Sequence, residues 1–533
     1  MSNPPQKSIP QAVISRYGYV LDKTTMTEDQ LVDVRKDLTV EPFNAFLQDV
    51  SHRKTFNVFQ ENETKISVPR FYGMTKFGPP QVDKINTKEY PVQKMKYTGK
   101  LRPNQEIIVE KVLKGLKSGG GGILVAGCGS GKTNMFIYIA CLLGLKTLIM
   151  THKTFLKNQI IDRITSNTNQ KKVGIIQQKK RDVDHPFVVG MIQTICKKRK
   201  PGNETDEIQT LRDMLSQFQL VIIDEVHHMA ASGFSRAFTM MCPKYILGVS
   251  AESARNDGCY KVIHWFMGPI LHFEEQKPND QVIVRAFHFR SSDEKHTKVY
   301  MNKYLKTEDR TKMVTNLTSI KGRNKFIYQL IQHFFNDGKN VLFLSGRRDQ
   351  VNYLKKKLDN DECTKENVGL YLGEMSQDEL EISKTKQIIL GTYDMAQEGL
   401  DIPTLNVVIL GTPKSAIKQS VGRILRQEFY EEHPLVVDIV DDAEIFTKQF
   451  GKRLKYYEKQ EYTIYHSYVA DDEDLCDPKP VKGEIYHMYN DEKYFKSCMT
   501  DLSLQEKPKK PSKHEYVPMV TKAHRTQSLF VED

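Results

Sequence analysis

The chain has 533 residues, a formal charge of +12 and 39% hydrophobic residues, so it is too long for one ordinary domain and suits a polyanionic partner. No apolar run approaches the ~20 residues that cross a bilayer, which excludes a membrane partner, and the first seven residues hold no apolar core of a secretory signal. The 8 cysteines form no C-x-x-C pair, so we expect an intracellular, reducing compartment and no zinc knuckle.

Residues 1–95 are turn-rich and aromatic, and we expect an N-terminal accessory region there. From Gly99 onward, short β-branched runs alternate with longer helical patterns. The runs lie at 123–125, 147–150, 187–191, 221–223 and 245–249. This alternation is typical of a parallel sheet covered by helices on both faces, so we predict an α/β domain over residues 96–275.

The segment AGCGSGKT, residues 126–133, stands between the first of these runs and a helical pattern. A loop with glycines such as Gly129 and Gly131 before a helix cradles phosphates with its backbone N–H groups. The Lys132 ammonium would reach the β- and γ-phosphates, and the Thr133 hydroxyl is a natural Mg²⁺ ligand. The first residue of the segment is alanine, which departs by one position from the strict phosphate-loop pattern.

The segment DEVH, residues 224–227, follows the apolar run Leu-Val-Ile-Ile. We expect Asp224 to hold Mg²⁺ mostly through water, and Glu225 to act as the general base that orients the attacking water. His227 would either link this site to the other domain or cap the loop. The loop and the DEVH segment together predict an ATP-powered enzyme.

A second set of β-branched runs lies at 340–344, 368–371, 387–390, 407–410 and 435–439. It predicts a second α/β domain over residues 321–465, joined to the first by a linker or helical insertion at 276–320. Residues 466–533 combine an acidic stretch with a basic, Pro-rich run, and we expect a partly disordered C-terminal extension.

In the second domain, residues 391–403 form a small-residue turn after a predicted strand. Such a turn lets the backbone approach a polyanion. Thr392 could donate to a phosphate, and Asp401 could bind the ribose of a nucleotide or an arginine. The alternative is an ordinary strand-to-helix loop with a cap.

The segment QSVGRILR, residues 419–426, carries two arginines three positions apart. On a helix, Arg423 and Arg426 would share one face. Together with Gln419 they fit a γ-phosphate sensor acting across a cleft between two domains, because a planar guanidinium stabilises charge on phosphate oxygens. The alternative is a basic helix face in water.

The order of these motifs, together with LRPNQ, MTHK, GMIQT, SAE and VLFLS, resembles superfamily 2 helicases over roughly residues 96–460. The most similar types are the xeroderma-pigmentosum-B repair and transcription helicases, the phage UvsW type and the helicases of large DNA viruses. The resemblance implies two tandem RecA-like domains that clamp ATP between them and bind a nucleic-acid strand across their tops.

The same resemblance implies roles for residues outside the phosphate loop. Arg102 and Gln105 would contact adenine. Thr151, Thr194 and Thr392 would lie along the strand-binding surface, where contacts to the phosphate backbone carry no base specificity.

One departure from the family is plain in its third motif, which usually reads Ser/Thr-Ala-Thr. Here Ser250 and Ala251 are followed by Glu252. That motif couples hydrolysis to strand movement in the family, and His227 and Ser250 are the expected coupling partners. A carboxylate there puts strand separation in doubt more than ATP hydrolysis.

We therefore expect an ATP- and Mg²⁺-dependent DNA helicase or translocase with little sequence preference, serving DNA repair or transcription beside that machinery. The alternatives are an RNA helicase, a translocase that strips transcripts or proteins without separating a duplex, and a catalytically weak binding subunit. The expected location is the nucleus, or a virion or viral factory if the chain is viral.

Overall fold

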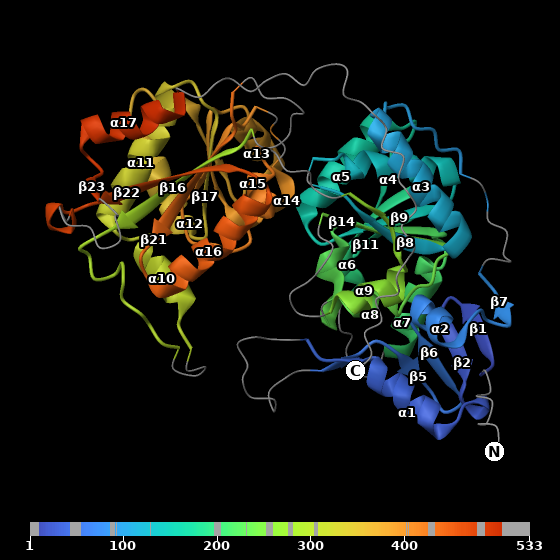
Figure 1. The fold of residues 1–533 in the computed structure, drawn as a ribbon. Coiled ribbons are helices and arrows are strands. Elements are labelled where there is room, and N and C mark those ends of the chain that lie inside the picture. The colour runs from blue at the N-terminus through green and yellow to red at the C-terminus, as the bar shows by residue number, and fades with distance from the viewer. Residues whose placement is uncertain are drawn as a thin grey trace, which may run out of the picture.

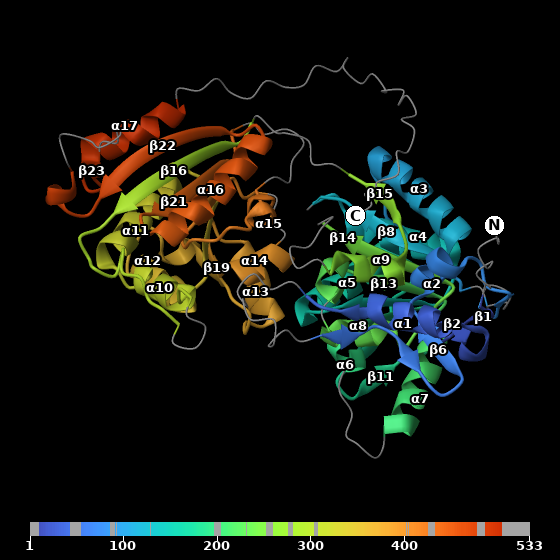
Figure 2. The ribbon, with the colours of Figure 1, turned by 60° about the horizontal axis from the view of Figure 1, so that its bottom comes forward.

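The computed structural model describes residues 10–42, 55–85, 91, 93–127, 129–196, 204–230, 232–251, 259–274, 281–302, 307–400, 402, 404–424, 432–476 and 486–503. Two eight-stranded sheets and one five-stranded sheet organise this part of the chain. Figures 1 and 2 show the two larger sheets in two lobes, with the small sheet beside the first.

The N-terminal region folds around the five-stranded sheet, whose strand order is β5-β6-β2-β1-β7. A capping box formed by Thr27 and Gln30 starts its first helix. Its elements are β1 (Ala12–Ser15), β2 (Gly18–Asp22), α1 (Glu28–Asp37), β3 (Thr39–Val40), β4 (Phe56–Asn57), β5 (Gln60–Glu61), β6 (Lys65–Val68), α2 (Arg70–Phe77) and β7 (Val82–Asp83).

This region packs against the first large domain and shares a hydrophobic core with it. The Arg70 guanidinium donates to the Pro243 and Lys244 carbonyls at 3.4 and 3.2 Å. The rings of Tyr72 and Trp265 meet edge to face, 5.6 Å apart. The N-terminal region is therefore built onto the first large domain.

The first large sheet has the order β11-β10-β12-β9-β13-β14-β8-β15 and is parallel apart from the β10–β11 hairpin. Its elements are α3 (Pro103–Gly119), β8 (Gly121–Val125), α4 (Lys132–Leu143), β9 (Thr147–Thr151), α5 (Thr154–Asn167), β10 (Gly174–Gln177), β11 (Lys180–Asp182), β12 (Phe187–Met191), α6 (Ile192–Cys196), α7 (Glu204–Leu215), β13 (Leu220–Ile223), α8 (Ser232–Phe238), β14 (Tyr245–Ser250), α9 (Tyr260–Met267) and β15 (Ile270–Phe273).

Both faces of this sheet are covered, as the unbroken apolar runs indicate. In β13, Val221 and Ile223 enter the core on one face, whereas Leu220 and Ile222 enter the core on the other. The predicted strands of this domain each correspond to an observed one. The mixed α/β fold with parallel RecA-like sheets is thus as expected.

The second large sheet has the order β18-β19-β17-β20-β21-β16-β22-β23, and its strand pairs are parallel. Its elements are β16 (Ile283–Arg290), α10 (Arg310–Leu317), α11 (Lys321–Asn336), β17 (Val341–Ser345), α12 (Arg348–Asp359), β18 (Val368–Tyr371), α13 (Gln377–Lys384), β19 (Ile388–Thr392), α14 (Tyr393–Gly399), β20 (Val407–Leu410), α15 (Lys418–Val421), β21 (Leu435–Asp441), α16 (Glu444–Lys459), β22 (Thr463–Ala470), β23 (His487–Met488) and α17 (Glu492–Ser503).

Within the segment 276–320, expected to be a linker or helical insertion, residues 283–290 form β16 of this sheet and residues 310–317 form α10. Strand β16 pairs with β21 on one side and β22 on the other. Its partners lie more than a hundred residues away in the sequence, so a local pattern does not show the pairing. Strand β22 likewise crosses the expected boundary at 465, so residues 466–470 belong to the sheet.

Among the described residues, no helix has the length and apolar content that crossing a bilayer requires.

Candidate nucleotide and nucleic-acid site

The phosphate-loop segment joins β8 to α4 at the carboxyl edge of the first sheet. Gly129 and Gly131 both have φ of 79°, a backbone conformation that favours glycine. A Cβ on Gly131 would lie 2.3 Å from Gln105 Nε2. The loop therefore requires glycine at that position, and its N–H groups lie at the N-terminus of α4, as a phosphate cradle requires.

Lys132 is the first residue of α4, and its ammonium turns back over the loop. Its Nζ donates to the Ala126 carbonyl at 3.0 Å and the Gly127 carbonyl at 2.9 Å. Thr133 follows in the first turn of the same helix. The lysine charge is thus held over the glycine loop, where an anion would bind.

Arg102 and Gln105, expected to contact adenine, are bonded to the backbone of the phosphate loop. The Arg102 guanidinium donates to the Gly129 carbonyl at 3.3 Å and to the Ser130 carbonyl at 2.8 Å. Gln105 Nε2 donates to the same Ser130 carbonyl at 2.8 Å. Both side chains therefore fix the loop's conformation, a role that the sequence did not indicate.

Asp224 lies directly after β13 and is buried. Its N–H donates to the Met150 carbonyl at the end of β9. Burial and the neighbouring Glu225 raise the pKa of Asp224 to about 7, while the Lys132 charge opposes that rise. The lysine and the aspartate, 92 residues apart in sequence, thus interact at one edge of the sheet.

His227 links the DEVH segment to the third motif within the same domain. Its Nδ1 lies 2.9 Å from Ser250 Oγ and 3.3 Å from Glu225 Oε2. Both His227 and Ser250 are buried. These contacts lie within the first domain, so the predicted link to the other domain and the predicted loop cap both stay predictions.

Glu252, the departure in the third motif, lies outside the described residues, as do Asp401 and Arg426. Their predicted roles stay predictions.

The expected arginine helix is shorter than the sequence indicates. Helix α15 ends at Val421, and the turn at Gly422 follows it, so Arg423 is not on a regular helix. Arg423 is buried, and its Nη1 donates to the Leu400 carbonyl at 2.9 Å within its own domain. Gln419 lies within α15 and is partly exposed.

The three threonines expected along a strand-binding surface differ in their surroundings. Thr151 is fully buried at the end of β9, so its side chain does not lie on a surface. Thr194 is partly exposed, and its Oγ1 accepts from the Gln178 N–H at 3.0 Å. Thr392 is partly exposed and lines a hollow between the two large domains.

We call this hollow the interdomain groove; its volume is about 850 Å³. The first domain contributes His152, Lys153 and Phe155, and the second contributes Arg348 and Thr392. Lys153 Nζ also donates across the groove to the Asp394 carbonyl at 3.4 Å. The lining combines apolar side chains with one cation from each domain, Lys153 and Arg348, and Arg348 also pairs with Glu374 at 2.8 Å. Aromatic and cationic groups such as Phe155 and Lys153 are the kind that bind a single strand.

Two other basic residues, one in each large domain, bond within their own domain. Lys157 is buried and donates to Gln177 Oε1 at 2.9 Å. The Arg347 guanidinium donates to Thr315 Oγ1 at 2.9 Å and to the Thr311 carbonyl at 2.6 Å. Both serve packing within their domains. Phe155 and Arg348 line the groove instead, and no motif in the sequence marks them.

Two protein families match separate parts of the chain. The family described as "Type III restriction enzyme, res subunit" matches residues 98–255, and the family described as "Helicase conserved C-terminal domain" matches residues 322–428. These spans contain the phosphate loop and the second-domain motifs respectively.

The chain is also similar to viral proteins. It is 50% identical over 493 residues to "Putative ATP-dependent RNA helicase L396" of Acanthamoeba polyphaga mimivirus, covering 92% of this chain and 91% of that protein. It is 26% identical to "Putative helicase 161L" of Invertebrate iridescent virus 6, over 70% of this chain and 84% of that protein. The crystal structure of T4 UvsW aligns with a TM-score of 0.33 and 18% identity, over 86% of this chain and 99% of that one.

Proposed function

This chain belongs to the superfamily 2 helicases and is ATP-dependent, and from that premise we propose that it is a DNA-directed translocase or helicase. One observation carries the choice of DNA. The first large domain matches the restriction-enzyme subunit family over residues 98–255, and the name of that family describes an enzyme that acts on DNA. A repair or transcription role remains the expectation from the motif resemblance.

The residues at the edge of the first sheet fit Mg²⁺–ATP. The glycine loop offers backbone N–H groups to phosphates, and Lys132 holds a positive charge above it. Thr133 and the buried Asp224 would hold Mg²⁺, which when bound offsets charge that develops on the phosphates. Glu225 would accept the proton of the attacking water, and Arg102 and Gln105 would hold the loop besides contacting adenine.

In the second domain, Arg423, Arg426 and Gln419 would form the γ-phosphate sensor, and Asp401 would contact the ribose. Arg423 donates to the Leu400 carbonyl, so turning it toward a nucleotide would require a rearrangement of this segment. We propose that domain closure around ATP brings about this change, and that repeated closure moves the nucleic acid.

The interdomain groove is the proposed path of the strand. Thr392 and Lys153 line it from opposite domains and would contact backbone phosphates. Thr194 is not among the lining residues, but it follows Gln193, which is, and it would be a further contact. His227 and Ser250 would couple changes at the nucleotide site to this groove. Glu252 would take part in the same coupling, because it lies in the same motif as Ser250. Such contacts predict binding with little sequence preference and a strong dependence on salt.

We also propose a domain division for the family's two ATP-clamping units, over residues 96–275 and 281–503. Residues 10–85 would be an accessory unit, and the remaining C-terminal residues an extension. The sheet memberships described above support these limits.

RNA is the second candidate substrate, because the mimivirus protein that is 50% identical is named as an RNA helicase. RNA differs from DNA in its 2′-hydroxyl groups, and the motifs that contact phosphates do not indicate whether a protein binds those hydroxyls.

The test measures ATPase rates of the full chain with single-stranded DNA, duplex DNA and RNA of matched length, and Lys132→Ala is the control for a contaminating ATPase. We expect DNA to stimulate hydrolysis more than RNA. Stimulation by RNA alone would overturn the DNA assignment, and no stimulation by any of the polymers would overturn the proposal itself.

A further inference from the structure

The turn between β20 and α15, residues 411–414, connects the second sheet to the segment that carries Gln419 and Arg423. Gly411 N–H donates to the Leu344 carbonyl at 2.8 Å, and a Cβ on Gly411 would lie 2.3 Å from the Phe343 ring. Thr412 is buried. The turn is therefore held tightly against strand β17.

Side chains from three different helices donate to the carbonyls of this turn. Arg323 Nη1 of α11 donates to the Gly411 carbonyl at 2.8 Å. The Tyr393 hydroxyl of α14 donates to the Thr412 carbonyl at 2.8 Å. Arg453 Nη1 of α16 donates to the Lys414 carbonyl at 2.8 Å.

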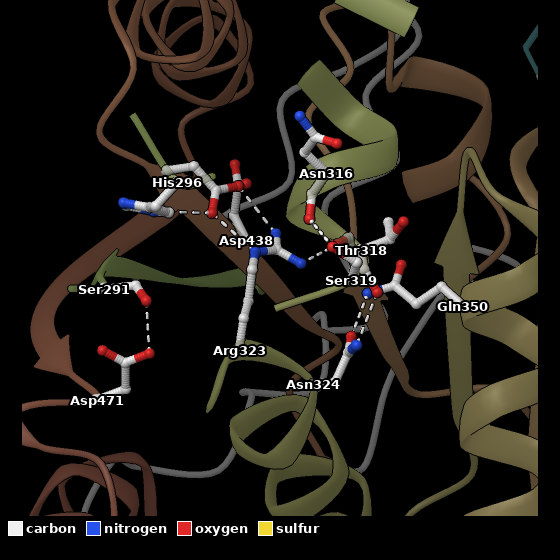
Figure 3. A network of polar contacts seen from close by, with 12 residues as sticks. Ser291, His296, Asn316, Thr318, Ser319, Arg323, Asn324, Gln350, Asp438 and Asp471 are labelled. Atoms are coloured by element: carbon white, nitrogen blue, oxygen red, sulfur yellow. Dashed lines mark hydrogen bonds and ion pairs between the residues drawn. The ribbon is translucent and has the colours of Figure 1, made fainter. Parts of the chain in front are cut away.

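Both arginines are fixed by buried aspartates of β21. Arg323 makes two bonds to Asp441, at 2.7 and 2.9 Å, and Arg453 makes two bonds to Asp438, at 2.8 and 2.9 Å. Figure 3 shows Arg323 within its network of polar contacts. A guanidinium held in two places by one carboxylate has little freedom, so it fixes the carbonyl that it also contacts.

One further contact ties this turn to the end of β17. Thr412 Oγ1 accepts from the Gly346 N–H at 2.8 Å, at the end of β17. Nearby, Gln350 joins Asn324 to Ser345 through bonds of 2.8 and 2.7 Å (Figure 3). The turn thus contacts Gly346, which follows β17, and Tyr393, which begins α14 directly after β19.

Helix α14 connects the interdomain groove, at Thr392, to the segment that carries Arg423. Thr392, which lines the interdomain groove, is its N-cap residue, and Tyr393 follows. At the other end of the helix, the Leu400 carbonyl accepts from Arg423. The Lys414 ammonium lies 4.7 Å from the centre of the Tyr393 ring, and the Asp394 carbonyl accepts from Lys153 of the first domain.

We propose that the turn at residues 411–414 is a mechanical link between the nucleic-acid groove and the arginine segment, and that Tyr393 and Thr412 are its positioning residues. A strand that contacts Thr392 displaces the start of α14. The Tyr393 hydroxyl passes this displacement to the turn, and the turn moves α15 and Arg423. The anchored arginines limit the turn's motion to a small range. This inference rests on the proposed function.

The test compares Tyr393→Phe and Thr412→Val with the matched control Tyr328→Phe. Tyr328 lies in the same domain and donates one hydroxyl bond to Asp361 at 2.9 Å, away from the turn. The measurements are kcat with and without stimulating DNA, the KM for ATP, the Kd for DNA and Tm, all on the full chain.

We expect Tyr393→Phe and Thr412→Val to lower the DNA-stimulated kcat about tenfold toward the unstimulated rate. The KM for ATP and the Kd for DNA should stay within twofold, and Tyr328→Phe should keep the full stimulated kcat. A stimulated kcat within twofold of wild type in both turn variants would overturn the link. Weaker DNA binding (a higher Kd) with an unchanged stimulated kcat would also overturn it. So would an equal loss of stimulated kcat in Tyr328→Phe, if that loss accompanies a fall in Tm. If wild type itself shows no stimulation, the proposed function fails instead.

Discussion

The two large sheets have similar parallel topology, but charged residues serve different purposes at their carboxyl edges. In the first domain Lys132, Asp224 and Glu225 gather around a glycine loop, and the lysine bonds only to loop carbonyls among the described contacts. In the second domain Arg323 and Arg453 each bind a buried aspartate in two places. One edge leaves charge available for a ligand, whereas the other uses charge to hold its own loops.

This difference predicts that the second domain depends on its ion pairs for stability. Asp441→Asn removes the charge that Arg323 needs, and breaking a buried pair costs about 3–5 kcal/mol. Hydrogen exchange should rise sharply in peptides from β16 to β21 and remain unchanged in the first domain.

The adjacent Asp442 offers the control. It pairs with Arg290 at 2.9 Å in a partly exposed position, so Asp442→Asn should cost no more than about 1 kcal/mol. Equal effects of the two variants would show that the buried pair has no special role.

In the first domain, removing a charged side chain should lower the ATPase rate and not the stability. Lys132→Ala removes the charge above the phosphate loop, and we expect ATPase to fall by about 10²–10³-fold, a typical cost of deleting one group that stabilises developing charge. Its Tm should change little, because the lysine's two bonds go to carbonyls of the phosphate loop and not to groups that join the core strands. Full activity in this variant would contradict the site assignment.

A smaller effect should appear as the pH falls. Burial and the nearby His466 lower the pKa of His288 to about 4, with Asp438 opposing, whereas the unfolded value is about 6.5. The stability that depends on neutral His288 is therefore complete above pH 6.5 and is lost as the pH falls toward 4. The Tyr468 ring stacks on His288 at 4.6 Å and helps to keep it from water.

His288→Gln removes this titration. The fall in second-domain Tm between pH 6.5 and 4 should become shallower in that variant. An unchanged profile would assign the acid sensitivity to other groups.

The smallest expected effect concerns an exposed pair on α16. Lys448 and Glu444 are an i,i+4 pair on the surface of the helix. Glu444→Gln should leave the free energy of unfolding almost unchanged, because both partners are exposed to solvent. A loss as large as that of Asp441→Asn, measured by denaturant unfolding, would break the contrast between buried and exposed charge.

The parts of this molecule that follow from local sequence were predictable. The phosphate loop and DEVH segment are each contiguous and follow apolar runs, so the sequence places them at strand ends. Strand β16 was missed because its partners, β21 and β22, lie far along the chain. Thr151 was expected on a surface, but it is buried where β9 lies between two neighbouring strands.

The sequence also did not predict that Arg323 and Arg453 are buried and paired with aspartates. Arg323 and Arg453 lie in helices among other charged residues and resemble solvent-exposed positions. Only the packing of α11 and α16 against β21 brings them to Asp441 and Asp438. Nor does the sequence show that Arg102 and Gln105 hold the phosphate loop, because the bonds reach carbonyls 25 to 28 residues away.

The central claim is that ATP hydrolysis moves this protein along DNA, and a displacement assay tests it most directly. The substrate is a DNA strand carrying a streptavidin block at one end, with an RNA strand of the same length in parallel and Glu225→Gln as the inactive control. We predict ATP-dependent release of streptavidin from DNA by the wild-type chain and none by the variant. DNA-stimulated hydrolysis without any release would contradict movement, and release from RNA alone would contradict DNA as the track.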